Sequence, residues 1–264
     1  MNLRRASHVL VGLILSLVFV APAFAYSVVY QNGLNGYSGT QDTFVRYNLD
    51  VNYGNRDTLY FLDGVTNTGV DRDTSMLFSF DISSLPTNAQ VTSATLSLYK
   101  LYSTVDPVAS VYKITSGPWS EGTKNGTAEA GSADWYDRIH GGAGITKVAW
   151  NTPGLGAGTD YDAAALDSES ITAAGWYNWD ITSAVQGWYA FGDNYGVFLK
   201  AFGQAYNTAG INLTQVFATS EYSPTGKEYL RPKLTVTYVI TPEPATMSLF
   251  GLGLFGLLGL KRKK

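Results

Sequence analysis

Hydrophobic and polar side chains alternate along most of the chain, with a period of two residues. In residues 91–99, Ala94, Leu96 and Leu98 share one face, whereas Thr95 and Ser97 share the other. Runs of this kind are rich in β-branched and aromatic residues and end at Gly, Asn, Asp or Pro, which is typical of β-strands with one buried face. Strands are predicted over residues 43–46, 58–62, 76–80, 91–99, 109–114, 175–179, 196–201, 215–219 and 234–238.

One segment has a helical period instead. Ile181, Ala184, Val185 and Trp188 are spaced at i, i+3, i+4 and i+7, which predicts one short amphipathic helix with Asp180 as its N-cap. We expect its apolar stripe to belong to the core. Many short strands and a single helix predict an all-β protein built as a two-sheet β-sandwich.

The pattern loosens over residues 120–174, which are rich in Gly, Ala, Ser, Thr and Asp with isolated aromatic residues. A connection of this length without periodicity is either functional or mobile. No repeat or domain boundary interrupts it. We therefore predict one domain, residues 26–240, with a long loop-rich insertion.

The first 25 residues have the features of a secretory signal peptide. Arg4 and Arg5 precede an apolar run over residues 9–20, which ends at the small-x-small sequence Ala23-Phe24-Ala25. A transmembrane anchor is the alternative, but the apolar run is short for a span. We expect cleavage before Tyr26 and secretion across the inner membrane.

The other end combines a short motif, an apolar stretch and a basic cluster. Pro242, Glu243 and Pro244 precede apolar residues 245–260, and the chain stops at the basic residues 261–264. As a helix the apolar stretch would be about 24 Å long, slightly less than a bilayer core of about 30 Å, so the basic end would have to reach the interface.

Segment 241–264 resembles the PEP-CTERM sorting signal. The resemblance implies a transient membrane anchor at residues 245–260, processing by an exosortase and delivery to the surface or matrix of a Gram-negative exopolysaccharide producer. The alternative is a plain C-terminal membrane helix, which would leave the domain facing the periplasm.

Composition narrows the function classes. The segment 26–240 keeps 12 basic and 20 acidic side chains, a net charge of about −8, which argues against nucleic acid as a partner. Cysteine is absent, so no disulfide stabilises the domain. His140 is its only histidine, which leaves little material for a zinc site or a Ser/His/Asp triad.

Several motifs together resemble the DNRLRE domain family, relatives of disaggregatase-type and alginate-associated carbohydrate-binding modules. The resemblance implies a jelly-roll-like β-sandwich that binds acidic or cell-envelope polysaccharide. Arg72 is displaced from the position that the family often uses for Arg, so it carries no predicted role. The motifs lie at residues 42–46, 52–54, 77–86, 91–96, 119–123, 135, 150–154, 179–188 and 231–234.

A glycan site needs flat aromatic faces together with carboxylate, amide or basic groups. The loop-rich insertion offers that mixture, and the predicted glycan-binding residues are Trp135, Tyr136, Arg138, Trp150, Tyr161 and Asp162. We expect Trp119, Trp179 and Trp188 to be buried instead, and for Trp135 and Tyr136 both possibilities stay open. The negative net charge disfavours an acidic polymer, so a neutral or self-produced matrix glycan is equally plausible.

Paired aspartates fit three interpretations: solvated turns, a glycosidase acid and base, or calcium ligands. The pairs are Asp71/Asp73, Asp134/Asp137 and Asp160/Asp162. Solvated turns are the commonest role of such pairs. Of the other two interpretations calcium is favoured over a glycosidase, and the candidate ligands of a structural calcium ion are Asp160 and Asp162. A polysaccharide lyase would have to use His140 with Tyr136 and Arg138.

Taken together, these patterns predict an exported, non-catalytic surface or matrix protein that binds extracellular polysaccharide. The alternatives are a structural matrix protein without glycan specificity and, ranked last, a polysaccharide lyase or hydrolase.

Overall fold

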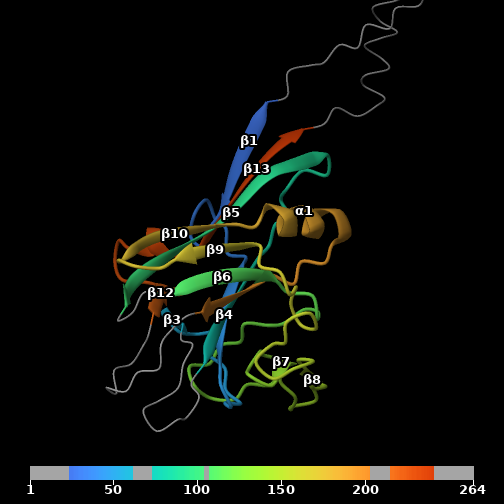
Figure 1. Cartoon of the computed structure of the whole chain (residues 1–264), viewed down its shortest axis with the longest axis vertical. Coiled ribbons are helices and arrows are strands. Elements are labelled where there is room, and N and C mark those ends of the chain that lie inside the picture. The colour runs from blue at the N-terminus through green and yellow to red at the C-terminus, as the bar shows by residue number, and fades with distance from the viewer. Residues whose placement is uncertain (1–23, 62–72, 104–106, 203–214, 241–264) are drawn as a thin grey trace, which may run out of the picture.

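The computed structural model describes residues 24–61, 73–103, 107–202 and 215–240. Two antiparallel sheets dominate it (Figure 1). The six-stranded sheet contains β1 (Ala25–Tyr30), β3 (Thr58–Phe61), β5 (Ala89–Ser103), β10 (Gly175–Asp180), β12 (Gln215–Ala218) and β13 (Lys233–Ile240). The five-stranded sheet contains β2 (Thr40–Arg46), β4 (Thr74–Phe80), β6 (Val108–Lys113), β9 (Asp167–Ser170) and β11 (Val197–Phe202).

The remaining elements are short. β7 (Asp137–Ile139) and β8 (Val148–Ala149) form a small hairpin, α1 (Thr182–Phe191) is the α-helix, and a 3-10 turn covers Glu228–Leu230. From β1 to β6 the chain alternates between the two sheets, so that strands paired within a sheet are remote in sequence. The structure thus confirms the all-β sandwich with one short helix.

The main core lies between the inner faces of the two sheets. Phe44, Phe78 and Leu199 from one sheet meet Leu96 and Val236 from the other, and all are buried. These side chains come from alternate positions of their strands, because successive side chains in a strand point to opposite faces. The alternation in the sequence therefore identifies the inner faces.

The five-stranded sheet is covered on its outer face as well. Val45, Leu77 and Phe198, which alternate with the inner residues, form a second buried cluster with side chains of the segment between β6 and β9. We call this segment, residues 114–166, the insertion. The sequence predicted a functional or mobile connection over residues 120–174, and the structure shows that most of this connection shares a buried cluster with the outer face of the five-stranded sheet.

All nine predicted strands are present, and Trp119, Trp179 and Trp188 are buried as expected. Four strands were missed: β1, and the short β7, β8 and β9. The helix prediction is confirmed, except that the N-cap is Ile181. Asp180 lies one residue earlier, where its carboxylate accepts the Thr182 amide at 2.8 Å.

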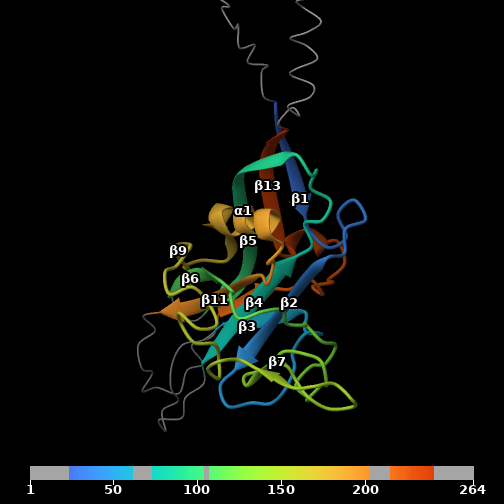
Figure 2. The same cartoon turned by 90° about the vertical axis from the view of Figure 1, so that its right-hand side faces the viewer.

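The start of β1 and the end of β13 lie side by side, since Ala25 pairs with Val239. The β7–β8 hairpin lies at the opposite end of the molecule (Figures 1 and 2). Within the described ranges, no helix is both long and apolar enough to span a bilayer. The predicted anchor at residues 245–260, the motif Pro242, Glu243 and Pro244, and all of the signal peptide except Phe24 and Ala25 lie outside those ranges.

Candidate functional site

Aromatic and polar side chains gather where the turn after β2 meets the insertion. The rings of Tyr47 and Trp135 pack edge to face with centroids 5.2 Å apart, and Tyr47 is 38% exposed. The Tyr136 hydroxyl donates a hydrogen bond to the side-chain oxygen of Asn48. We call the surface formed by Tyr47, Asn48, Asp50, Trp135, Tyr136 and Lys147 the corner surface.

Local backbone geometry positions the β2 side of this surface. Asn48 has a left-handed φ of 55°, which asparagine tolerates better than most residues. The Leu49 amide donates to the Arg46 carbonyl at 3.1 Å, and the Tyr47 amide donates to the Asp73 carbonyl at 2.8 Å. The chain therefore turns directly after β2, and Tyr47 and Asn48 stay exposed.

On the insertion side, a buried carboxylate organises the turn that carries the two aromatic rings. Asp134 accepts the backbone amides of Tyr136 at 2.7 Å and Asp137 at 2.9 Å. Its own carbonyl accepts the indole N–H of Trp150 at 2.9 Å. Trp150 thus supports Trp135 and Tyr136 from within the insertion.

A glycine lies directly against the Trp135 ring. The Gly154 amide donates to the Trp135 carbonyl at 2.7 Å, and a Cβ at Gly154 would lie 2.3 Å from the ring. Gly154 also has a φ of +78°. Only glycine allows both this conformation and this close approach, so position 154 fixes where Trp135 lies.

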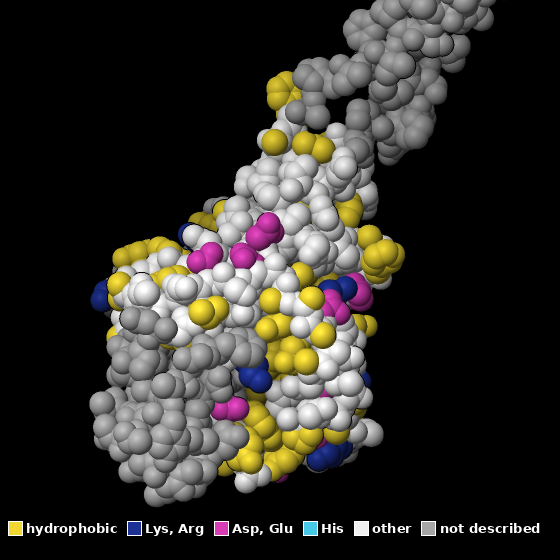
Figure 3. All heavy atoms as spheres, in the orientation of Figure 1, with side chains coloured by type: hydrophobic (Ala, Val, Ile, Leu, Met, Phe, Trp, Pro, Cys, Tyr) yellow, Lys and Arg dark blue, Asp and Glu magenta, His cyan; other side chains and the backbone are white. Residues whose placement is uncertain are grey.

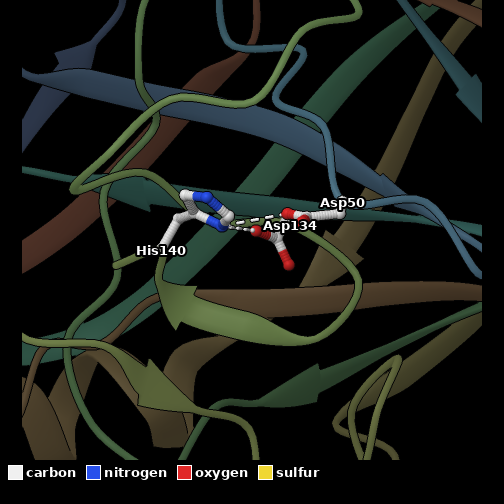
Figure 4. Close-up of side chains that lie close together, drawn as sticks. All are labelled: Asp50, Asp134 and His140. Atoms are coloured by element: carbon white, nitrogen blue, oxygen red, sulfur yellow. Dashed lines mark hydrogen bonds and ion pairs between the residues drawn. The ribbon is translucent and has the colours of Figure 1, made fainter. Parts of the chain in front are cut away.

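Ionisable groups lie beside the aromatic pair. Figure 4 shows the His140 ring turned toward Asp134 and Asp50, and its Nδ1 lies 2.8 Å and 2.9 Å from their carboxylates. Lys147 Nζ lies 3.0 Å from the carboxylate of buried Asp137. Burial raises the pKa of Asp134, and the hydrogen bonds from the Tyr136 and Asp137 amides and from His140 oppose that rise.

The structure separates the six predicted glycan-binding residues. Trp135 and Tyr136 lie half-buried on the corner surface, but Trp150 and Tyr161 are only 3% and 5% exposed and belong to the core of the insertion. An indole or phenol this deeply buried presents no face to a sugar. Both residues belong to the second buried cluster, and the segment that contains them shows no hydrophobic period in the sequence.

The other two residues, Arg138 and Asp162, lie at the surface and share none of the contacts described for Trp135 and Tyr136. Arg138 donates from its guanidinium to the Pro118 carbonyl at 2.9 Å, and Asp162 is exposed. The three residues of the lyase hypothesis engage different partners: His140 the aspartates, Tyr136 the Asn48 amide oxygen, and Arg138 the Pro118 carbonyl.

The proposed calcium pair has an asymmetric environment. Asp160 is fully buried, and its two oxygens accept hydrogen bonds at 2.8 to 3.1 Å from the Asn151 amide and side chain and from the amides of Thr152 and Gly156. Asp162 is exposed. Asp160 therefore acts as the organiser of a tight loop, and its geometry adds no support for a calcium ion shared with Asp162.

A shallow pocket of about 250 Å³ lies at the start of β2 and the end of β4. Its lining includes the polar residues Gln41, Ser79, Asp81, Asn194 and Tyr195. The Asn194 side-chain amide donates to the Phe80 carbonyl at 2.8 Å. Its lining residues are Gly39, Gln41, Ser79, Phe80, Asp81, Pro118, Trp119, Asn194 and Tyr195.

Sequence reasoning missed this pocket and the β2 side of the corner surface. Tyr47, Asn48 and Asp50 stand just after a predicted strand, where exposed side chains are common, and that position is the one signal that points to them. The pocket joins four separate segments and has no sequence signal. On the face shown in Figure 3, basic side chains are isolated rather than gathered into a patch.

Comparisons with known families give two matches. The family model of carbohydrate-binding module family 96 matches residues 35–130, which run from before β2 into the insertion and include Tyr47, Asn48 and Asp50. The model of the PEP-CTERM protein-sorting motif matches residues 241–263. No curated protein matches the sequence.

These matches point to a non-catalytic module that binds carbohydrate and to export with sorting to the cell envelope. The matching module bears a different family name from DNRLRE, so that assignment stays a prediction. By its sequence, the segment 35–130 is similar to a carbohydrate-binding module of family 96, and the end of the chain is similar to an exosortase sorting signal.

Proposed function

We propose that this protein is an exported, non-catalytic protein of the cell surface or extracellular matrix that binds polysaccharide through the corner surface. The similarity of residues 35–130 to a carbohydrate-binding module is the observation that carries the proposal. The similarity of residues 241–263 to the PEP-CTERM motif supports sorting by an exosortase in a Gram-negative envelope.

The corner surface has the chemistry that a sugar ring requires. Tyr47 and Trp135 provide aromatic surface against which the C–H groups of a pyranose pack, because the negative face of a π-system attracts polarised C–H groups. Asn48, Asp50 and Lys147 provide donors and acceptors for hydroxyls, and Asp50 and Lys147 have side chains 59% and 60% exposed. The site is open, which suits a polymer chain rather than a small enclosed ligand.

The charge of the domain limits the glycan. A segment with a net charge of about −8 repels an acidic polymer at long range, and Lys147 on the corner surface is already paired with Asp137. We therefore propose a neutral or weakly charged matrix polysaccharide.

Affinity electrophoresis tests the proposal. The full chain, purified in detergent, is run through gels that contain neutral, acidic or host-derived polysaccharides. We expect one class to retard the chain, and Tyr47→Ala and Trp135→Ala to weaken that retardation about tenfold, since one aromatic contact contributes about 1.4 kcal/mol.

Phe191→Ala is the matched control, because Phe191 is an exposed aromatic residue (82%) on α1. If no polysaccharide retards the chain, the proposal is wrong, and a structural matrix protein that associates with other proteins becomes the better account. If retardation survives both corner variants but fails with Asn194→Ala, the pocket is the site.

A further inference from the structure

Three carboxylates from distant parts of the sequence converge beneath β2. Asp42 lies in β2, Glu121 in the insertion, and Glu221 three residues after β12 ends. One carboxylate oxygen from each residue lies within 4.8 Å of the other two. Of these residues, Asp42 is fully buried and the two glutamates are half-buried.

Two oxygens of this group lack hydrogen-bond partners. One oxygen of Asp42 accepts the Ser220 amide at 2.7 Å, whereas Oδ1 is buried without a partner. One oxygen of Glu221 accepts the Ser220 hydroxyl at 2.7 Å, whereas Oε2 is buried without a partner. A buried carboxylate oxygen without a donor is costly, and in native proteins it is usually satisfied by a proton, a water or a cation.

No basic side chain of the described residues pairs directly with these three carboxylates. Arg231 is the basic residue that acts on Glu221, but its guanidinium donates to the carbonyls of Tyr222 at 2.9 Å and Asn32 at 3.1 Å. Three acidic groups thus share one small volume without a direct counter-charge.

We propose that Asp42, Glu121 and Glu221 bind a divalent cation, calcium. The donor atoms are all carboxylate oxygens, which are the ligands that hard cations prefer. Zinc sites, in contrast, usually contain His or Cys ligands. Calcium accepts six to eight oxygens in irregular geometry, and the half-buried glutamates leave one side on which water completes the shell. Asp42 Oδ1 and Glu221 Oε2 supply the two ligands that have no other partner.

Such an ion would connect the two sheets and the insertion in a chain that has no disulfides. Its ligands lie on β2 of the five-stranded sheet, on the insertion, and on the turn that follows β12 of the six-stranded sheet. The backbone is already in place for this, because the Asp42 amide donates to Glu121 Oε1 at 2.7 Å. Desolvation and mutual repulsion raise the pKa of Asp42 and Glu121, as expected for acids gathered without a cation.

Calorimetry on the full chain in detergent, freed of metal by a chelator and then dialysed, tests the site. Titration with CaCl₂ at pH 8 is expected to show one site per chain. At about one hundred times the dissociation constant, calcium is expected to raise the melting temperature by roughly 5–10 °C. Absence of both binding heat and a shift in melting temperature would overturn the proposal.

Variants locate the site. Glu221→Gln and Asp42→Asn are expected to weaken calcium binding at least tenfold, yet Glu221→Gln should melt no lower than the parent in chelator, because it removes a repulsive charge. That comparison separates loss of the site from loss of the fold, even if Asp42→Asn does not fold. Asp50→Asn, from the acidic group around His140, is the control, and loss of calcium binding there instead would overturn the assignment.

Discussion

Asp160 shows how a single buried carboxylate organises a loop that has no regular structure. Because its oxygens accept three backbone amides and one side-chain amide, we expect Asp160→Ala to lower the free energy of unfolding by about 3 kcal/mol. Urea unfolding followed by tryptophan fluorescence measures this. Asp162→Ala is the control and should change stability by less than about 0.5 kcal/mol, since Asp162 is exposed. Equal effects at the two positions would contradict the assigned role.

Glu121 makes stability depend on pH in the metal-free chain. Its pKa is raised to about 9, first by burial and then by the nearby charges of Asp42 and Glu221. A raised pKa stabilises the fold fully below the unfolded value of about 4.3, and this stabilisation is lost as the pH rises toward 9. Asp42 and Glu221 shift in the same direction, and Arg231 opposes the shift at Glu221.

We therefore expect the melting temperature of the chelator-treated chain to fall between about pH 5 and pH 9, as followed by circular dichroism. Glu121→Gln should make that slope markedly shallower. A melting temperature that rises across this interval, or an unchanged slope in the variant, would show that the acidic group does not titrate in this way.

The burial of some individual side chains could be predicted from the sequence, whereas the burial of others could not. Trp179 and Trp188 sit in periodic segments, so their inward faces could be predicted. Trp150 and Tyr161 sit in an aperiodic segment, where nothing in the sequence distinguishes a core aromatic residue from a binding one. The same limit applies to Asp42, Glu121 and Glu221, which only the tertiary fold brings together.

Among the elements, α1 is the one whose face could be predicted most directly. Ile181, Ala184, Val185 and Trp188 are all buried, as the i, i+3, i+4, i+7 spacing indicated. We expect Trp188→Ala to reduce the free energy of unfolding by about 3–5 kcal/mol through cavity formation, whereas Phe191→Ala on the exposed side should have little effect. Chemical denaturation of both variants measures the difference, and a comparable loss for Phe191→Ala would contradict the orientation of the helix.

The buried cluster of the insertion could not be predicted from the sequence, because it forms only against the outer face of the five-stranded sheet. The five-stranded sheet has apolar side chains on both faces, and the uninterrupted run Met76-Leu77-Phe78 is the sequence trace of this, since a strand buried on both faces loses its alternation. That run indicates that some segment must cover the outer face. The sequence does not indicate which one.

Gly154 connects this insertion core to the corner surface. Gly154→Ala would place a methyl group against the Trp135 ring, so we expect it to move the ring, change the fluorescence of the chain and weaken retardation by polysaccharide. Gly158→Ala is a matched control, because Gly158 has a similar φ of +74° but open space around its Cβ position. If both variants weaken binding equally, general strain in the loop and not the position of Trp135 explains the loss.

In the whole molecule, one end of the sandwich leads to the sorting motif and the opposite end carries the proposed glycan surface. β13 ends at Ile240, directly before the matched sorting motif, and the start of β1 lies beside it. The corner surface belongs to the opposite end, next to β7 (Figures 1 and 2). A domain attached through residues 241–263 would therefore present its proposed glycan surface away from the point of attachment.

The claim that the corner surface binds polysaccharide is tested most directly by hydrogen–deuterium exchange of the full chain, with and without the polysaccharide that retards it. We predict that bound glycan slows exchange in residues 46–52 and 134–140 and leaves α1 and the start of β1 unchanged. Protection confined to the pocket residues around Asn194, or to the outer face of the six-stranded sheet, would contradict the account.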